Sequence, residues 1–127
     1  MLSTTCGTPF MDLRELVDAL AAGDALRARV LMREAQVRQH DWSATVMPIG
    51  MDRNGLAIAA GVVELVCQRE RLQPPPWTAR VEAADADVFL VRSTQSMPRL
   101  RRLCILEGPW PLRRRRIFVP PEFLSAA

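Results

Sequence analysis

The chain contains no lysine, and it has few of the side chains that build metal sites or active sites. Its 127 residues include seventeen arginines, three cysteines and one histidine. Cys6, Cys67 and Cys104 are far apart, form no Cys-x-x-Cys pair and lack the spacing of zinc ligands. We therefore expect reduced thiols, with Cys67 and Cys104 buried on helices, and we expect neither a metal ion nor a cofactor.

Long apolar runs are also missing. No run approaches the roughly 18 residues that cross a membrane as a helix. The longest, residues 56–63, is followed at once by Glu64. The first nine residues lack the cationic start and apolar stretch of a signal peptide. These absences predict a cytoplasmic protein that does not associate with membranes.

None of the common active-site motifs occurs in the sequence. The glycines are dispersed and form no Gly-x-Gly-x-x-Gly or Gly-Lys-Ser/Thr loop, and there is no Gly-x-Ser-x-Gly turn. His40 has Asp41 and Ser43 as neighbours, but neighbours in sequence seldom form the geometry of a nucleophile and its general base. We interpret His40 as a surface or helix-terminal side chain. An enzyme is the least favoured hypothesis, and we expect the protein not to be one.

Hydrophobic periodicity predicts helices in the N-terminal half. Apolar residues recur at helical spacing over residues 12–22 and 25–39. Gly23 and Asp24 between them are typical of a helix end followed by an N-cap, so the two segments predict an αα-hairpin. A third and more apolar helix is predicted over residues 53–72 and should form the centre of the core.

The C-terminal half is rich in proline and less regular. Three prolines at residues 74–76 end the third helix. Residues 88–91 are interpreted as an extended segment or the start of a helix, because a single strand would have no visible partner. Proline positions predict a helix over residues 98–107, one further turn over 112–116 and a short final helix over 120–125.

The predicted fold class is all-α: a small helical bundle built on an N-terminal αα-hairpin and an apolar third helix, with a Pro-rich, partly irregular C-terminal half. An apolar content of 49% is enough for a packed core in one domain. Residues 1–8 are expected to be a flexible tail, and residues 9–127 a single helical domain. Within it, residues 10–73 form a helical core, 74–97 a Pro-rich, acidic connector and 98–127 a basic C-terminal segment.

Charge is divided unevenly along the chain. Residues 1–98 contain ten arginines and twelve acids, whereas residues 99–127 contain seven arginines and two acids. Such an asymmetry predicts an anionic or acidic partner. Guanidinium groups suit either a protein or a nucleic acid, because they bind carboxylate and phosphate through paired hydrogen bonds.

We predict that partner-binding residues lie in the basic C-terminal segment. Four consecutive arginines at 113–116 cannot all face one way on a helix, so at least one should pair internally, with Glu107 or Glu122 as the carboxylate. The candidate partner-binding residues are Arg99, Arg101, Arg102, Trp110, Arg113, Arg114, Arg115, Arg116 and Phe118.

The three tryptophans are assigned different roles. Trp42 and Trp77 are interpreted as core residues at places where loops cross helices. Trp110 stands between two prolines and just before the arginine run. It could stack on a base, anchor a protein partner or hold its own loop in place.

From residue 74 onward the sequence resembles the tail of a family of bacterial regulators. The resemblance rests on Pro75-Pro-Trp-Thr, Phe89-Leu-Val, Pro98-Arg-Leu-Arg, Leu106-Glu-Gly-Pro, Leu112-Arg-Arg-Arg-Arg-Ile-Phe-Val and Glu122-Phe-Leu-Ser. In this order and spacing, the blocks are similar to the C-terminal segment of antitoxin-like helix-turn-helix regulators encoded beside nucleotidyltransferase-type toxins. The resemblance covers less than half of the chain and places Glu107, Arg113 to Arg116 and Phe118 on recurring positions. The DNA-reading domain of that family has no counterpart here, because the N-terminal residues contain no recognisable recognition helix.

Two functional hypotheses follow. The first is a non-catalytic, antitoxin-like interaction protein that binds a partner protein through the basic C-terminal segment; the resemblance implies a toxin encoded next to it. The alternative is a nucleic-acid-binding regulatory module that places the same arginines on phosphates. Either function is compatible with a homo-oligomer.

Overall fold

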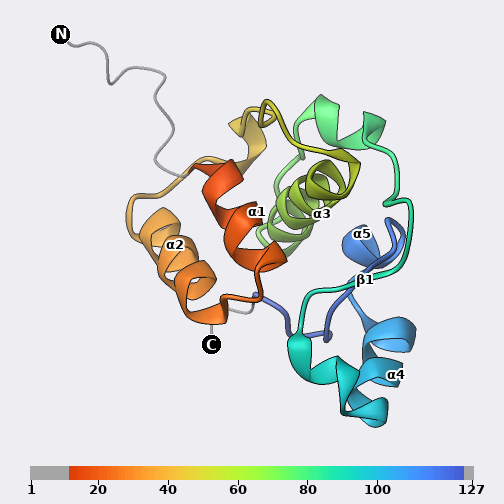
Figure 1. The fold of residues 1–127 in the computed structure, drawn as a ribbon. Coiled ribbons are helices and arrows are strands. Elements are labelled where there is room, and N and C mark those ends of the chain that lie inside the picture. The colour runs from red at the N-terminus through yellow and green to blue at the C-terminus, as the bar shows by residue number, and fades with distance from the viewer. Residues whose placement is uncertain (1–11, 125–127) are drawn as a thin grey trace, which may run out of the picture.

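A computed structural model describes residues 12–124, which are mainly helical, as predicted (Figure 1). The predicted flexible tail, residues 1–8, and Cys6 lie outside the described residues. In chain order the elements are α1 (Leu13–Ala21), α2 (Ala25–Val37), η1 (Trp42–Ala44), α3 (Arg53–Arg69), η2 (Pro76–Arg80), β1 (Val88–Phe89), η3 (Arg92–Gln95), α4 (Pro98–Glu107), α5 (Trp110–Arg113) and β2 (Ile117–Phe118), where η marks a 3₁₀ helix. None of the described helices is long and apolar enough to cross a membrane.

Helices α1 and α2 form the predicted αα-hairpin. The Asp12 carboxylate caps α1 by accepting a hydrogen bond from the backbone N–H of Arg14 at 3.1 Å. Asp24 caps α2 in the same way, with the N–H of Arg27 at 3.1 Å. Gly23 between the helices has φ +75°, a left-handed conformation that glycine adopts without steric cost. The tight reversal follows directly from the Gly-Asp pair.

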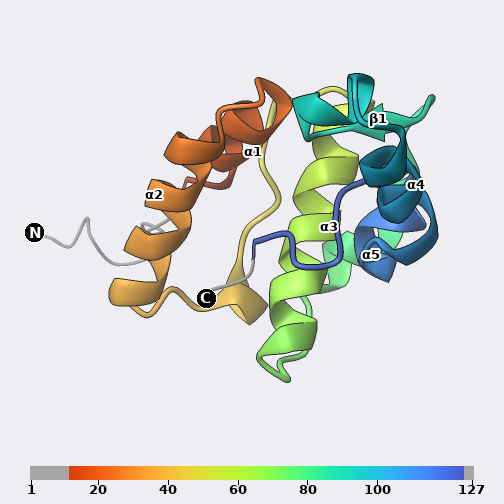
Figure 2. The ribbon, with the colours of Figure 1, turned by 90° about the horizontal axis from the view of Figure 1, so that it is seen from below.

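Helix α3 is the centre of the core, as predicted. Eleven of its seventeen residues are buried, and Figure 2 shows it between the α1–α2 hairpin and the C-terminal elements. Asp52 caps its start by accepting from the N–H of Gly55 at 2.8 Å. The helix ends at Arg69 rather than at residue 72, because Arg71 adopts a left-handed conformation with φ 58°. The N–H of Leu72 then closes the turn on the carbonyl of Cys67 at 2.8 Å.

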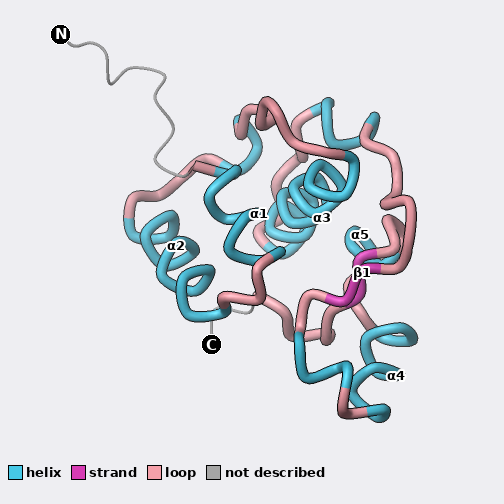
Figure 3. The backbone as a smooth tube through the Cα atoms, in the orientation of Figure 1, coloured by secondary structure: helices cyan, strands magenta, loops and turns pink. Residues whose placement is uncertain are grey.

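The structure corrects the interpretation of residues 88–91, because this segment has a strand partner. β1 pairs in parallel with β2, with Val88 opposite Ile117 and Phe89 opposite Phe118 (Figure 3). The two phenylalanine rings stack with their centroids 5.2 Å apart. The sequence does not reveal the partner strand, because this strand has only two residues and follows directly after arginines that are predicted to form a helical turn.

Two further predictions for the C-terminal half were wrong. The turn expected over residues 112–116 lies earlier, as α5, because Pro109 and Pro111 fit the N-cap and the first turn of a helix. The final helix expected over 120–125 does not form within the described residues, where 121–124 make a turn. Arg69 of α3 holds that turn against the body by donating to the carbonyl of Phe123 at 2.6 Å.

Residues 111–119 complete the core. Leu112, Ile117 and Val119 are fully buried and belong to the same apolar cluster as α1 and α3. Leu112 approaches α3 at Gly61, where a Cβ atom would lie 2.4 Å from Cδ2 of the leucine. The basic C-terminal segment is therefore divided, because its second half is part of the core while α4 lies at the edge of the molecule.

The predictions for two tryptophans and two cysteines are confirmed. Trp42 is buried, and Trp77 is half-buried and donates its indole N–H to the carbonyl of Thr45 at 2.8 Å. Cys67 and Cys104 are free, buried and located on α3 and α4. Burial raises the pKa of the Cys67 thiol to about 11, so it stays protonated at neutral pH.

Candidate partner-binding site

Arg115 is buried, with 1% of its surface exposed, and binds groups of its own chain. Its Nη1 atom donates to Oε1 of Glu64 at 2.6 Å, and its Nη2 atom donates to Oε2 at 3.1 Å. The same two nitrogens also donate to the carbonyls of Pro111 at 2.9 Å and Thr78 at 2.7 Å. This paired geometry joins the end of α5 to the middle of α3.

Glu64 receives a second arginine. Nη2 of Arg114 lies 3.1 Å from Oε1 of the same carboxylate. Burial by itself would raise the pKa of Glu64, but the hydrogen bonds from Arg115 and Arg114 outweigh it and hold the pKa below its ordinary 4.5. The carboxylate is therefore ionised at neutral pH and compensates the buried guanidinium.

The other two arginines of the run also contact groups of the chain. Arg113 donates to the carbonyl of Leu106 at 2.6 Å, and its guanidinium carbon lies 5.3 Å from the centre of the Trp110 ring. Arg116 donates from Nε to Oδ1 of Asp87 at 2.9 Å. Internal pairing within the run was therefore predicted correctly.

The predicted internal partners, Glu107 and Glu122, were wrong. The carboxylates that bind the run are Glu64 and Asp87, which the sequence separates from it by 29 to 51 positions. Arg115 is also corrected as a partner-binding residue, because a buried side chain with four internal hydrogen bonds is not accessible to a partner. Phe118 is half-buried against Phe89 and contributes to the body of the protein.

The arginines of α4 are placed differently. Arg99, Arg101 and Arg102 are exposed, and within residues 12–124 none of them forms an ion pair. The guanidinium carbon of Arg101 lies 4.0 Å above the centre of the Phe89 ring, an arrangement that favours a cation. Arg99 and Arg102 are three positions apart on the helix and so lie on the same side of it.

Large apolar side chains stand beside these arginines. Only Cys104 is buried on α4, and Leu106 and Trp110 are 55% and 61% exposed. Leu106 is four positions from Arg102, so it continues the same side of the helix. We call the exposed residues Arg99, Arg101, Arg102, Leu106 and Trp110, together with the half-buried Arg113, the α4 face.

Sequence reasoning found the cations of the α4 face but missed Leu106. The sequence places Leu106 among other apolar residues of the predicted helix, and nothing in that pattern distinguishes an exposed leucine from a buried one. In the structure, α4 contacts mainly η3 and does not pack on α3 along its length, so this side chain has no core to enter. The α4 face therefore combines cations with uncovered apolar surface, and Glu107 is the only carboxylate on the helix.

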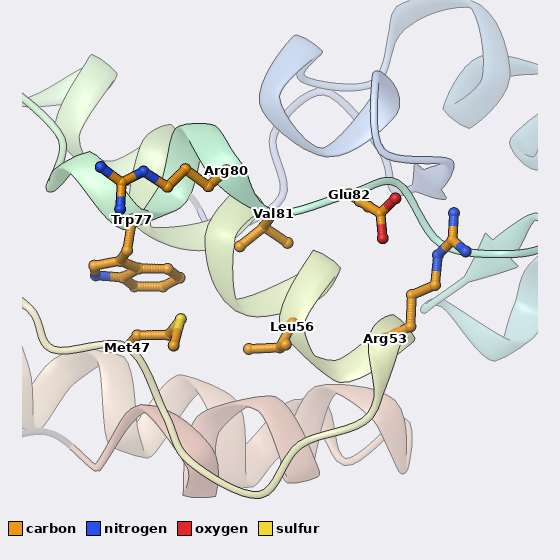
Figure 4. A pocket seen from close by; sticks show the side chains of 7 residues that line it. All are labelled: Met47, Arg53, Leu56, Trp77, Arg80, Val81 and Glu82. Atoms are coloured by element: carbon orange, nitrogen blue, oxygen red, sulfur yellow. The ribbon is translucent and has the colours of Figure 1, made fainter.

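A separate pocket of about 400 Å³ lies between the start of α3 and η2 (Figure 4). It is lined by Met47, Arg53, Leu56, Trp77, Arg80, Val81 and Glu82. These side chains include no histidine, cysteine or hydroxyl group, and Glu82 is the one carboxylate among them. Among residues 12–124, no three His, Cys, Asp or Glu side chains are grouped so that they could hold a metal ion.

His40 lies just after α2, and its Nε2 atom is 3.0 Å from Oγ1 of Thr45. Its ring meets that of Trp42 edge-on, with centroids 4.9 Å apart. Ser43 directs its hydroxyl to Asp41 at 2.6 Å, so it is not held by the histidine as a nucleophile would be. The histidine is helix-terminal, as predicted, and half-buried.

The environment of His40 predicts a pH dependence of stability. Burial lowers its pKa below 6.5, and the nearby Asp41 only partly opposes this. The imidazole of His40 therefore binds a proton more readily in the unfolded chain than in the folded one. The contribution of this histidine to the free energy of unfolding should be fully present above pH 6.5 and should be lost as the pH falls towards the pKa of the folded state. Urea unfolding between pH 7 and 5 should show this decline in the wild type and a smaller one in His40→Gln. An equal decline in both proteins would contradict the assignment.

Comparison of the chain with protein-family models, with curated protein sequences and with solved structures found no match. The resemblance of the C-terminal half to antitoxin-like regulators therefore stays a prediction.

Proposed function

We propose that the protein is a non-catalytic, antitoxin-like interaction protein that binds an acidic partner protein through the α4 face. The observation that carries the proposal is the composition of α4, which buries only Cys104. It presents large apolar side chains together with arginines that form no ion pair within the described part of the chain. A helix that contributes little to its own core and exposes such a surface is typical of a recognition element.

The chemistry of the α4 face suggests how such a partner would be held. Trp110 and Leu106 would enter an apolar hollow of the partner, since desolvated aromatic anchors dominate the binding energy of many interfaces. Arg99 and Arg102 would pair with carboxylates around that hollow through two hydrogen bonds each. The resemblance supports a toxin encoded next to this protein as the partner.

A nucleic acid fits the α4 face less well. The affinity of a protein for nucleic acid increases with the number of arginines that contact phosphates. Three of the four arginines at 113–116 already form ion pairs with Glu64 or Asp87 of the same chain. Leu106 would have no counterpart on a phosphate backbone. A protein partner uses both the charged and the apolar components of this surface.

Substitutions in the α4 face should separate binding from folding. We expect Leu106→Asp and the double variant Arg99→Glu/Arg102→Glu each to weaken binding of the adjacent gene product by about 30-fold or more, the loss typical of interface hot spots. Both proteins should unfold at the wild-type temperature, because these side chains are exposed. Copurification of the two coexpressed proteins, followed by titration calorimetry, measures the effect.

Arg80→Glu is the matched control, since it reverses one exposed charge that lies outside α4 and α5. It should leave the affinity for the partner unchanged. Retention of wild-type affinity by both α4 variants would exclude this surface. The nucleic-acid alternative would be favoured if the protein bound duplex DNA and the logarithm of its association constant fell linearly with the logarithm of the salt concentration. The slope should be about −0.9 for each phosphate contact.

A further inference from the structure

The pocket between the start of α3 and η2 is an apolar slot with charged side chains at its ends (Figure 4). Leu56 and Val81 stand in the middle of the slot, and Trp77 and Met47 stand at one end. Its volume of about 400 Å³ is near the lower limit of the roughly 300–1,000 Å³ of small-molecule sites. The pocket therefore has room for one small molecule with an apolar body.

Trp77 is held in a fixed position at its end of the slot. Its indole N–H donates to the carbonyl of Thr45 at 2.8 Å, and the side chain is half-buried. The 3₁₀ helix that carries it begins with Pro75 and Pro76, whose rings restrict the backbone. An aromatic wall held in this way needs little reorganisation when a ligand enters, which lowers the cost of binding.

The opposite end of the slot has one cation and one anion. Figure 4 shows the side chains of Arg53 and Glu82 there, whereas Arg80 extends along the Trp77 end. Nε of Arg53 donates to the carbonyl of Ala83 at 2.7 Å. Because Ala83 directly follows Glu82 in the chain, this hydrogen bond keeps the two charged side chains at the same end of the slot.

Arg53 and Glu82 lie at the same end but do not pair with each other. Both side chains are exposed, and within residues 12–124 neither of them forms an ion pair. The hydrogen bond to Ala83 uses only Nε of Arg53, so the two terminal nitrogens of its guanidinium can donate to a ligand. This end of the slot therefore offers a pair of donors and a carboxylate acceptor to the same small molecule.

We propose that the pocket binds a free amino acid with a large apolar side chain. The carboxylate of the ligand pairs with Arg53 through two hydrogen bonds, and its ammonium group donates to Glu82. The side chain of the ligand lies between Leu56 and Val81 and reaches the ring of Trp77. A free amino acid has both charges beside one apolar group, whereas either end of a polypeptide has only one of the two.

The amino-acid site is separate from the α4 face, because the two share no residue. The inference is therefore independent of the proposed function. Its charged residues are exposed to solvent, which weakens ion pairs. We expect a dissociation constant on the order of 0.1–1 mM, because a ligand of this size gains a limited free energy for each of its atoms.

Titration of the full chain with L-phenylalanine, followed by two-dimensional NMR, tests the site. The signals of the Trp77 indole N–H and of the backbone N–H groups of residues 53–56 and 80–83 should shift, and those of α4 should not. Two related compounds test the charges, since 3-phenylpropionate lacks the ammonium group and phenethylamine lacks the carboxylate. Each should bind at least about tenfold more weakly, the usual cost of losing hydrogen bonds between charged groups.

Two variants should each remove the recognition of one charge. Arg53→Gln should weaken the binding of L-phenylalanine by about tenfold or more but should not weaken that of phenethylamine, which has no carboxylate to lose. Glu82→Gln should weaken L-phenylalanine to a similar extent but should not weaken 3-phenylpropionate. Arg29→Gln is the matched control, because it neutralises an exposed arginine of α2 outside the pocket, and it should bind all three compounds as the wild type does.

Circular dichroism verifies that each variant is folded, which we expect because the substituted side chains are exposed. The absence of shifts around the pocket at about 10 mM L-phenylalanine, roughly ten times the weakest expected dissociation constant, overturns the proposal. Equal affinities for the three compounds also overturn it, as do shifts confined to α2 or the α4 face. A further contrary result would be an equal loss of all three compounds in both Arg53→Gln and Glu82→Gln.

Discussion

Replacing Arg115 with methionine should destabilise the protein by about 3–5 kcal/mol, the usual cost of removing one member of a buried ion pair. The guanidinium makes four hydrogen bonds, two of them to Glu64. Its loss leaves the carbonyls of Pro111 and Thr78 without that donor. A domain of this size is stable by about 5–15 kcal/mol, so the variant should lose a large fraction of its stability. Urea denaturation followed by circular dichroism measures the change.

Lysine should not rescue this position, because one ammonium group cannot reproduce the planar pair of hydrogen bonds. Glu64→Gln should also be strongly destabilising, since it leaves the buried Arg115 without a counter-charge. The double variant Arg115→Met/Glu64→Leu should cost clearly less than the two single changes together, because neither charge is then left unpaired. Arg102→Met is the control, with an expected effect within about 0.5 kcal/mol. Equal losses in Arg102→Met and Arg115→Met would contradict this account.

Leu112→Ala should lower stability by about 2–5 kcal/mol, the range for large-to-small changes in a core. Leu112 is fully buried where α5 packs on α3, and it fills the space left by the missing side chain of Gly61. Removing it opens a cavity that the surrounding helices can close only in part. Urea denaturation again gives the difference in unfolding free energy.

Trp110→Ala, two residues away on the same short helix, provides the matched control. Trp110 is mostly exposed, so its loss should change stability by less than about 1 kcal/mol despite the larger side chain. If Trp110→Ala were the more damaging of the two, α5 would be anchored by its outer side and not by Leu112. The pair of variants therefore tests which side of α5 belongs to the core.

The helices of the N-terminal half were predictable because their signals are local. Gly23 and Asp24 determine a turn and a cap within a few residues, and the apolar content of α3 marks it as central without knowledge of its neighbours. The β1–β2 pair was not predictable in this way. Each strand has two residues, and Val88 meets Ile117 only through a contact that is distant in sequence.

The candidate site was predictable only in outline. The sequence identified the basic segment, and the four adjacent arginines required that some of them pair internally. It could not distinguish Arg115 from Arg114, because burial depends on where Glu64 of α3 lies when α5 packs against it. The exposed arginines of α4 remain available because that helix lies at the edge of the core.

The contacts between α3 and residues 111–119 also affect folding during translation. Helix α3 is synthesised about forty residues before the segment that covers part of its apolar surface. Until then, a nascent chain has an incomplete core and exposes side chains that are buried in the folded protein. Folding should therefore follow translation of this region instead of accompanying it, and the growing chain should be a substrate for chaperones.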